Sequence, residues 1–209
     1  MDSNDAAELI AELREERSDK VDSEHFTNRA ALLIAGLAAV LAIGGLGGGN
    51  ATDDMMVGNI RAANTWAFFQ AKNMRQTVYE IEVAELESRL PRAGGSEAES
   101  LEQRIGSYRA KIARYDDEPD ADAPHDPLKG EGKKQLMAQA QAFEAMRDRA
   151  SEQDNNFDYA EVALQLALVL GSVAILAGNR TVLTAAGILG AIGTLLTING
   201  FLLFAPLPL

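Results

Sequence analysis

The polar residues most able to do chemistry in this chain lie inside otherwise apolar runs. Glu161 and Gln165 are four residues apart at the start of one such run, and Asn199 stands near the end of the last one. An ionisable side chain within a membrane span is by default a functional hypothesis, for instance a proton or ion relay. Because Glu161 lies only about one turn inside its run, an interfacial carboxylate that reaches water is the competing interpretation.

No other group of residues forms a recognisable catalytic or metal-binding constellation. His25 and His125 lie in acidic segments far from any candidate partner, no serine stands in a nucleophile-elbow sequence, and cysteine is absent. Residues 116–127 hold six acids and three prolines. Clustered carboxylates suit Ca²⁺, but the spacing does not match a calcium-binding loop, and a solvated loop is the alternative. We therefore expect no catalytic, cofactor-binding or metal-binding residues and no enzymatic activity.

A glycine-rich run at residues 44–50 invites a phosphate-loop interpretation. The Lys-Ser/Thr pair that would hold phosphate and magnesium is missing, and no strand precedes the glycines. Five glycines in six residues instead indicate a flexible or closely packed link between two helical segments.

Three nearly charge-free runs, at residues 30–49, 162–178 and 182–204, are the elements that would position these side chains. A run of about 20 apolar residues spans the hydrocarbon core of a bilayer as a helix. The predicted fold is all-α, an integral membrane protein whose helical-hairpin and coiled-coil domain is inserted between the first and second spans. Its predicted parts are an acidic arm (1–28), a first span (29–49), an extramembrane domain (50–156), a second span (157–178), a third span (181–204) and a short tail (205–209).

Residues 53–90 follow the first run with apolar side chains on alternating three- and four-residue spacing. This heptad pattern is typical of helices that supercoil around each other. The pattern predicts an assembly seam made of Val57, Ile60, Asn64, Ala67, Ala71, Met74, Val78 and Ile81. Asn64 occupies a position where a buried amide sets register and oligomer number. The same helix carries three aromatic residues, Trp66, Phe68 and Phe69, which would either anchor it at a membrane interface or pack against a neighbouring helix.

Two further helical segments are predicted before the chain returns to the membrane. The first, at residues 97–115, has an apolar stripe and can pack antiparallel against part of the long helix. The second begins at Lys133 and continues into the second span. Whether the seam closes against residues 101–115 of the same chain or against another copy is left open by the pattern.

The charge distribution limits the partners and orients the chain. A formal net charge of −12 argues against nucleic acid and against a surface that docks on anionic lipid. Near the span ends, five basic residues lie on the side of the N-terminal arm and three on the side of residues 50–156. This difference favours a cytoplasmic N-terminus, with residues 50–156 on the opposite face of a cytoplasmic (inner) membrane.

An Asn-x-Trp-Ala-Phe segment, within residues 64–72, gives the chain a family resemblance. With residues 48–51, 113–115, 130–134, 157–161 and 199–201, it resembles a bacterial membrane-protein family catalogued as domain of unknown function 4337. The resemblance implies an integral membrane protein with the same order of spans, and it implies no activity, substrate or catalytic residues.

The leading functional expectation is a membrane-anchored coiled-coil protein with a structural or interaction role. It would contact membrane lipid and assemble with itself or within a membrane complex, without a cofactor. The alternative is an oligomeric channel or transport component in which Glu161, Gln165 and Asn199 face a pore.

Overall fold

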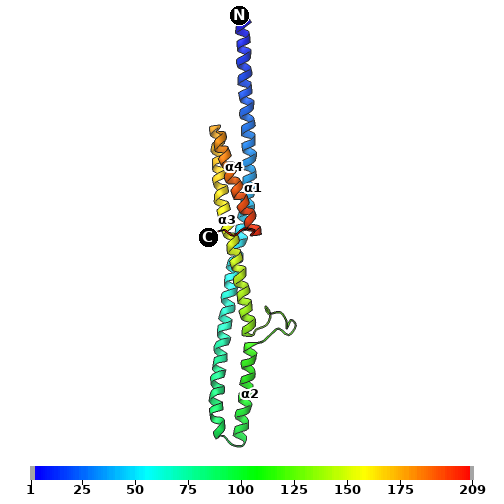
Figure 1. Cartoon of the computed structure of the whole chain (residues 1–209), viewed down its shortest axis with the longest axis vertical. Helices are drawn as coiled ribbons and strands as arrows, with labels where there is room; N and C mark the ends of the chain where they lie inside the picture. The colour runs from blue at the N-terminus through cyan, green and yellow to red at the C-terminus, as the bar shows by residue number, and fades with distance from the viewer. Residues whose placement is uncertain (1–2, 208–209) are drawn as a thin grey trace. The chain divides into compact units, whose positions relative to one another are not determined.

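The computed structural model describes the backbone of residues 3–207 and the side chains of Arg14, Arg17 and residues 20–207, and its fold is all-α (Figure 1). The described residues form four α-helices and one short 3-10 helix. These are α1 (Ser3–Arg89), η1 (Leu90–Arg92), α2 (Ser96–Asp116), α3 (Lys133–Ala177) and α4 (Arg180–Leu202). The predicted arm, first span and seam thus belong to one helix, since α1 continues through the glycine-rich run without a break.

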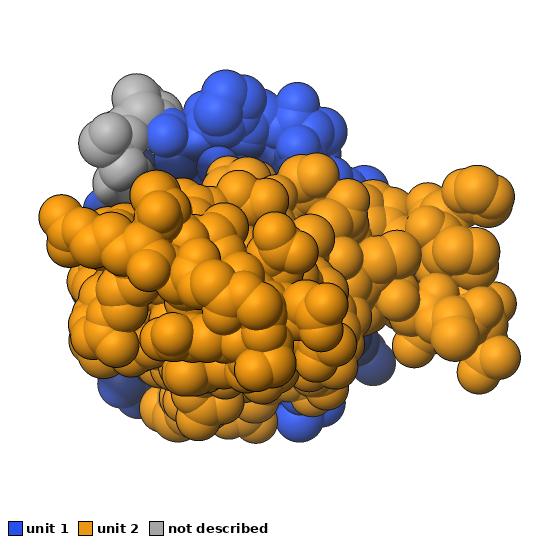
Figure 2. Space-filling view, turned by 90° about the horizontal axis from the view of Figure 1, so that it is seen from below, with its two compact units in different colours: residues 1–52, 151–209 blue, residues 53–150 orange. Residues whose placement is uncertain are grey.

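The internal contacts divide the chain into two compact units, coloured separately in Figure 2. Unit 1 comprises residues 1–52 and 151–209, and unit 2 comprises residues 53–150. Each unit therefore contains part of α1 and part of α3.

Unit 2 is a helical hairpin in which α2 and the first part of α3 lie along α1. Near the turn, α1 and α2 form a small apolar core. Its buried members are Val83, Leu86, Leu101 and Ile105. Further along, the backbone of α3 at Arg147 comes so close to α1 that a Cβ atom at Gly58 would lie 3.1 Å from the Arg147 nitrogen. The expected antiparallel contact of residues 97–115 with the long helix is thus present.

A loop joins α2 to α3 within unit 2 and stands away from the helices in Figure 1. Its two ends are held together by the backbone, because Glu131 N–H donates to the Glu118 carbonyl at 2.9 Å. An isolated bridge between Pro119 and Gly130 marks the same crossing. Gly130 has a φ of 106°, a backbone conformation that favours glycine.

Unit 1 is a three-helix arrangement in which glycines let the helices approach closely. A Cβ atom at Gly47 of α1 would lie 2.5 Å from the Phe157 ring of α3, and one at Gly200 of α4 would lie 2.7 Å from the same ring. Gly190 of α4 is equally tight against Leu37 of α1. Close approach through small residues is how helices associate in lipid. Within the glycine-rich run, Gly47 and Gly48 therefore allow close helix contact, and the helix itself is continuous.

Three of the described helices, α1, α3 and α4, are long and apolar enough to cross a membrane. The surface of unit 1 also exposes large apolar side chains. Among them are Leu32, Leu46, Val169, Leu176, Leu195 and Leu202.

Candidate functional site

The predicted assembly seam lies on the outside of unit 2. The larger side chains of the seam are strongly exposed, with Met74 at 71%, Ile81 at 62% and Val78 at 53%. The other seam positions are exposed as well: Val57, Ile60, Asn64, Ala67 and Ala71. Every predicted seam residue is thus exposed in the single chain, and none belongs to the apolar core that α1 forms with α2.

The opposite face of α1 makes the contacts within unit 2. This inner face consists of the buried residues Gly58, Ala62, Lys72, Gln76, Val83 and Leu86. Tyr79 adds to it by lying 5.2 Å from the Tyr108 ring of α2, measured between ring centroids. The sequence did not predict that this inner face is buried, because a lysine and a glutamine interrupt its apolar pattern. The signal that was available is the three- and four-residue spacing of Tyr79, Val83, Leu86 and Leu90.

Lys72 is the most unusual member of the inner face, since its side chain is only 6% exposed. Its ammonium group lies 3.0 Å from a Glu118 carboxylate oxygen and 3.7 Å from a Glu131 carboxylate oxygen. It also donates to the Glu131 backbone carbonyl. The Phe68 and Tyr115 rings flank the cation at 5.3 and 5.7 Å from their centroids. Lys72 thus holds both ends of the α2–α3 loop against α1.

The loop has a second attachment through Asp117, outside the apolar segments. The Gln135 side chain donates to this carboxylate at 2.7 Å, and Lys134 donates to its other oxygen at 3.0 Å. These hydrogen bonds, that of Gln135 first, lower the pKa of Asp117 below its usual range, while Asp117 raises the pKa of Lys134. Three acidic residues, Asp117, Glu118 and Glu131, therefore anchor this loop.

The three predicted interface aromatics do not share one environment. Trp66 donates its indole N–H to Glu144 of α3 at 2.8 Å and meets Phe69 edge-on at 5.5 Å between ring centroids. Phe68 is 41% exposed. Trp66 and Phe69 thus contribute to contacts within unit 2, which was one of the two interpretations of the sequence, and Phe68 is the aromatic that remains accessible.

The polar residues of the apolar runs separate into two groups. Glu161 and Gln165 are exposed on α3, where the Gln165 amide donates to the Glu161 carboxylate at 2.7 Å. Asn199 is buried, at 4% exposure. Within one chain, the structure therefore brings the first two together and places the third apart from them.

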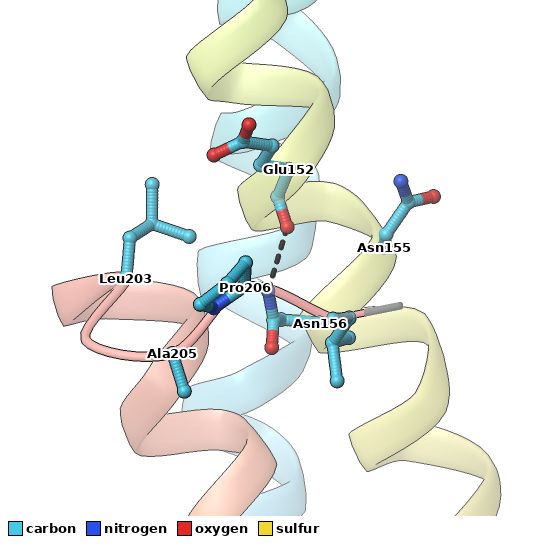
Figure 3. A pocket seen from close by; sticks show the side chains of 7 residues that line it. Glu152, Asn155, Asn156, Leu203, Ala205 and Pro206 are labelled. Atoms are coloured by element: carbon cyan, nitrogen blue, oxygen red, sulfur yellow. Dashed lines mark hydrogen bonds between the residues drawn. The ribbon is translucent and has the colours of Figure 1, made fainter. Parts of the chain in front are cut away.

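Asn199 is held by a compact hydrogen-bond network in unit 1. Its amide donates to the Asn156 side chain at 2.6 Å and to the Ala205 carbonyl at 2.8 Å, and its oxygen accepts from Ala205 N–H at 3.0 Å. Asn156 in turn donates to the Glu152 carbonyl at 2.7 Å, the bond drawn in Figure 3. A cavity of about 140 Å³ adjoins these groups. Asn199 thus fastens the C-terminal tail to α3.

Among the described residues, no three His, Asp or Glu side chains lie close enough together to hold a metal ion. What the described part of the chain does present is an exposed apolar stripe on one long helix, together with three helices able to cross a membrane. The fold is thus that of an all-α protein, and its three long apolar helices are compatible with a multi-pass membrane protein.

A family model matches most of the chain. The family model described as Domain of unknown function (DUF4337) matches residues 26–203, and the chain belongs to that family. The match covers the seam, the loop and the apolar runs as far as residue 203. No curated protein and no solved structure matches the chain.

Proposed function

We propose that this chain is a membrane-anchored coiled-coil protein of the cytoplasmic membrane that assembles with a second copy of itself through the seam on α1. The observation that carries the proposal is the exposure of every seam residue, from Val57 to Ile81, in the single chain. An exposed apolar stripe of this size is typical of a protein interaction surface.

The length of the seam supports pairing with another helix. Over about 36 Å, the stripe keeps its first and fourth heptad positions for more than three heptads, which is what a two-stranded coiled coil requires. Asn64, at a first position, would pair with its own counterpart and fix the register.

Membrane anchoring supports a second copy in parallel orientation as the partner. Two copies inserted with the same topology present α1 in the same direction, so that identical seam positions come face to face. The excess of basic residues near the N-terminal side of the spans favours a cytoplasmic N-terminus, with residues 50–156 on the opposite face.

Disulfide crosslinking in native membranes tests the proposal, since the chain has no cysteine of its own. Ala71→Cys places a thiol on the seam. Ala84→Cys is the matched control, because Ala84 is also an exposed alanine on α1 but lies about 140° around the helix from Ala71. Lys72, adjacent in sequence, is unsuitable as an outward control because it is buried.

Oxidation should give a strong dimer band with Ala71→Cys and little with Ala84→Cys. Adding Met74→Asp to the Ala71→Cys chain should suppress the dimer, since two carboxylates would face each other in the seam. Equal crosslinking at both alanines, or none at Ala71, would refute assembly through the seam. Resistance of the chain to carbonate extraction tests membrane anchoring separately.

A channel or transport component built from several copies is the second candidate. The observation that favours it is the exposure of Glu161 on a predicted span, where a carboxylate facing lipid is costly and one facing a pore or another subunit is not. Ion flux through the protein in liposomes, lost in Glu161→Gln, would support the channel. Flux no greater than that of empty liposomes would exclude it.

A further inference from the structure

A second feature of unit 1 is a cavity of about 400 Å³ between α1 and the first turn of α4. Arg29 of α1 and Arg180 of α4 line it, together with His25 and Asp22. The volume lies within the range of about 300–1,000 Å³ that is usual for small-ligand sites. The two arginines are 151 positions apart in the sequence, so only the fold brings them to one cavity.

Both guanidinium groups are available to a ligand. Within the described part of the chain, neither Arg29 nor Arg180 makes a side-chain hydrogen bond or an ion pair, and both residues are exposed. Each guanidinium offers a planar fork of N–H donors that fits the oxygens of a phosphate. With one carboxylate, Asp22, against two arginines, the cavity carries an excess of positive charge when His25 is neutral.

The N-terminus of α4 by itself contributes little to anion binding in this cavity. The Asn179 side chain already accepts hydrogen bonds from the Thr181 and Val182 N–H groups, at 2.9 and 3.4 Å. An anion in the cavity would therefore depend on the arginine side chains, and the positive end of the α4 dipole would only assist them.

The position of the arginines along the helices points to a lipid. Arg29 immediately precedes the charge-free run at residues 30–49, and Arg180 stands just before the run at 182–204. In a membrane-spanning chain, these positions lie at the level of the headgroups. Phe26 and Leu183 give the same cavity an apolar wall. A site with cationic and apolar sides matches the junction between headgroup and acyl chains better than it matches a free phosphate ion.

We propose that this cavity binds the phosphate of an anionic phospholipid, with Arg29 and Arg180 as its ligands. The inference rests on the membrane insertion included in the proposed function, and on that orientation the cavity faces the cytoplasmic leaflet, where anionic lipids concentrate. The net charge of −12 disfavours docking of the whole surface on such lipid, but it does not govern a discrete cavity with a local excess of positive charge.

Native mass spectrometry of the full chain in mild detergent tests the site. The probes are phosphatidylglycerol and phosphatidylcholine with identical acyl chains. The wild type should retain phosphatidylglycerol roughly tenfold better than phosphatidylcholine, and Arg29→Gln/Arg180→Gln should abolish this preference. The matched control is Arg75→Gln/Arg92→Gln, which removes the same charge from two exposed arginines of unit 2 and should leave the preference within about twofold.

A milder variant keeps the test independent of folding. Arg29→Lys/Arg180→Lys retains both charges but loses the planar forks, and it should weaken phosphatidylglycerol retention only partly. Equal retention of the two lipids by the wild type, or equal loss in the unit 2 control, would overturn the proposal. Complete displacement of phosphatidylglycerol by millimolar glycerol phosphate would also overturn it, because the site would then prefer a soluble phosphate.

Carbonate extraction separates the two possible failures. A chain that is washed from membranes refutes membrane anchoring and the lipid site together. A chain that stays in the membrane and crosslinks at Ala71→Cys, yet shows no preference for phosphatidylglycerol, refutes the lipid site alone.

Discussion

Replacing Lys72 by methionine should release the loop between α2 and α3 while leaving unit 1 intact. Lys72→Met keeps the apolar stem of the side chain but removes the ammonium group, which lies over the Phe68 and Tyr115 rings. That group now binds the Glu118 and Glu131 carboxylates and the Glu131 carbonyl. After the substitution, these oxygens lose their common donor.

The free-energy cost of Lys72→Met can be estimated from the exposure of Lys72 and of its carboxylate partners. Breaking a fully buried ion pair by removing one partner costs about 3–5 kcal/mol, and an exposed pair contributes roughly 0.2–1 kcal/mol. The Lys72 side chain is 6% exposed, but that of Glu118 is 31% exposed and keeps Arg114 at 3.4 Å. We therefore expect a cost between these limits, about 1.5–3 kcal/mol, the range of a hydrogen bond to a charged group.

Amide hydrogen exchange of the full chain in detergent measures this cost directly. The Glu131 amide, which donates to the Glu118 carbonyl, should exchange roughly ten- to a hundredfold faster in Lys72→Met. Lys129→Met is the control, because Lys129 lies in the same loop with an exposed side chain. Unchanged loop exchange in Lys72→Met, or equal acceleration in the control, would refute the assigned role of Lys72.

Three further predictions concern the other contacts of the two units. Gly47→Leu should lower the free energy of unfolding of the chain in detergent by more than about 1 kcal/mol, because the leucine side chain would collide with Phe157. Asn199→Leu should cost about 1–3 kcal/mol and speed amide exchange in the C-terminal tail, since it removes the tail's hydrogen bonds. The Gln135 hydrogen bond is the first cause of the lowered pKa of Asp117. The loop should therefore be protected from hydrogen exchange above the ordinary aspartate pKa of about 3.9. This protection should be lost as the pH falls through the lower pKa that Asp117 has in the folded chain. Loop exchange in Asp117→Asn should therefore exceed that of the wild type at neutral pH and match it in strong acid.

Each of these predictions has an outcome that contradicts it. Gly36→Leu is the control for Gly47→Leu, because no atom lies within 4 Å of a Cβ built at Gly36, and equal losses in both would remove the steric explanation. Normal protection of the tail in Asn199→Leu would show that the tail is held by other groups. A constant difference between Asp117→Asn and the wild type across the acid range would contradict the pKa assignment.

Much of the helical architecture was predictable because it depends on local patterns. The stripe of Leu101, Ile105, Tyr108 and Ile112 predicts the contact of α2 with α1, and these residues do form or border the apolar core. The charge-free runs likewise predict α4 and the second half of α3. In both cases, apolar side chains spaced at the helical period leave one face to bury, whatever the partner is.

The placement of single polar residues was not predictable. A lysine on a helix is ordinarily solvated, yet Lys72 is buried by contact with the α2–α3 loop, where Glu118 lies 46 positions further along the chain. Asn199 resembles any polar residue of a span, and only the return of the tail shows what it binds. Lys72 and Glu118 are 46 positions apart, and Asn199 also binds Asn156, which is 43 positions away. Helical periodicity carries no information about contacts at such separations.

The sequence by itself determined that residues 53–90 form a long helix with an apolar heptad stripe and that three segments are apolar enough to cross a membrane. Only the tertiary structure decided which face of α1 is covered within the chain. Gly58 admits the backbone of α3, and Val83 and Leu86 receive the apolar face of α2. The more regular seam is left exposed. The physical reason is that the spacing of apolar residues indicates only that a helix face tends to be buried. Which face the neighbouring helices cover depends on how well their shapes fit it.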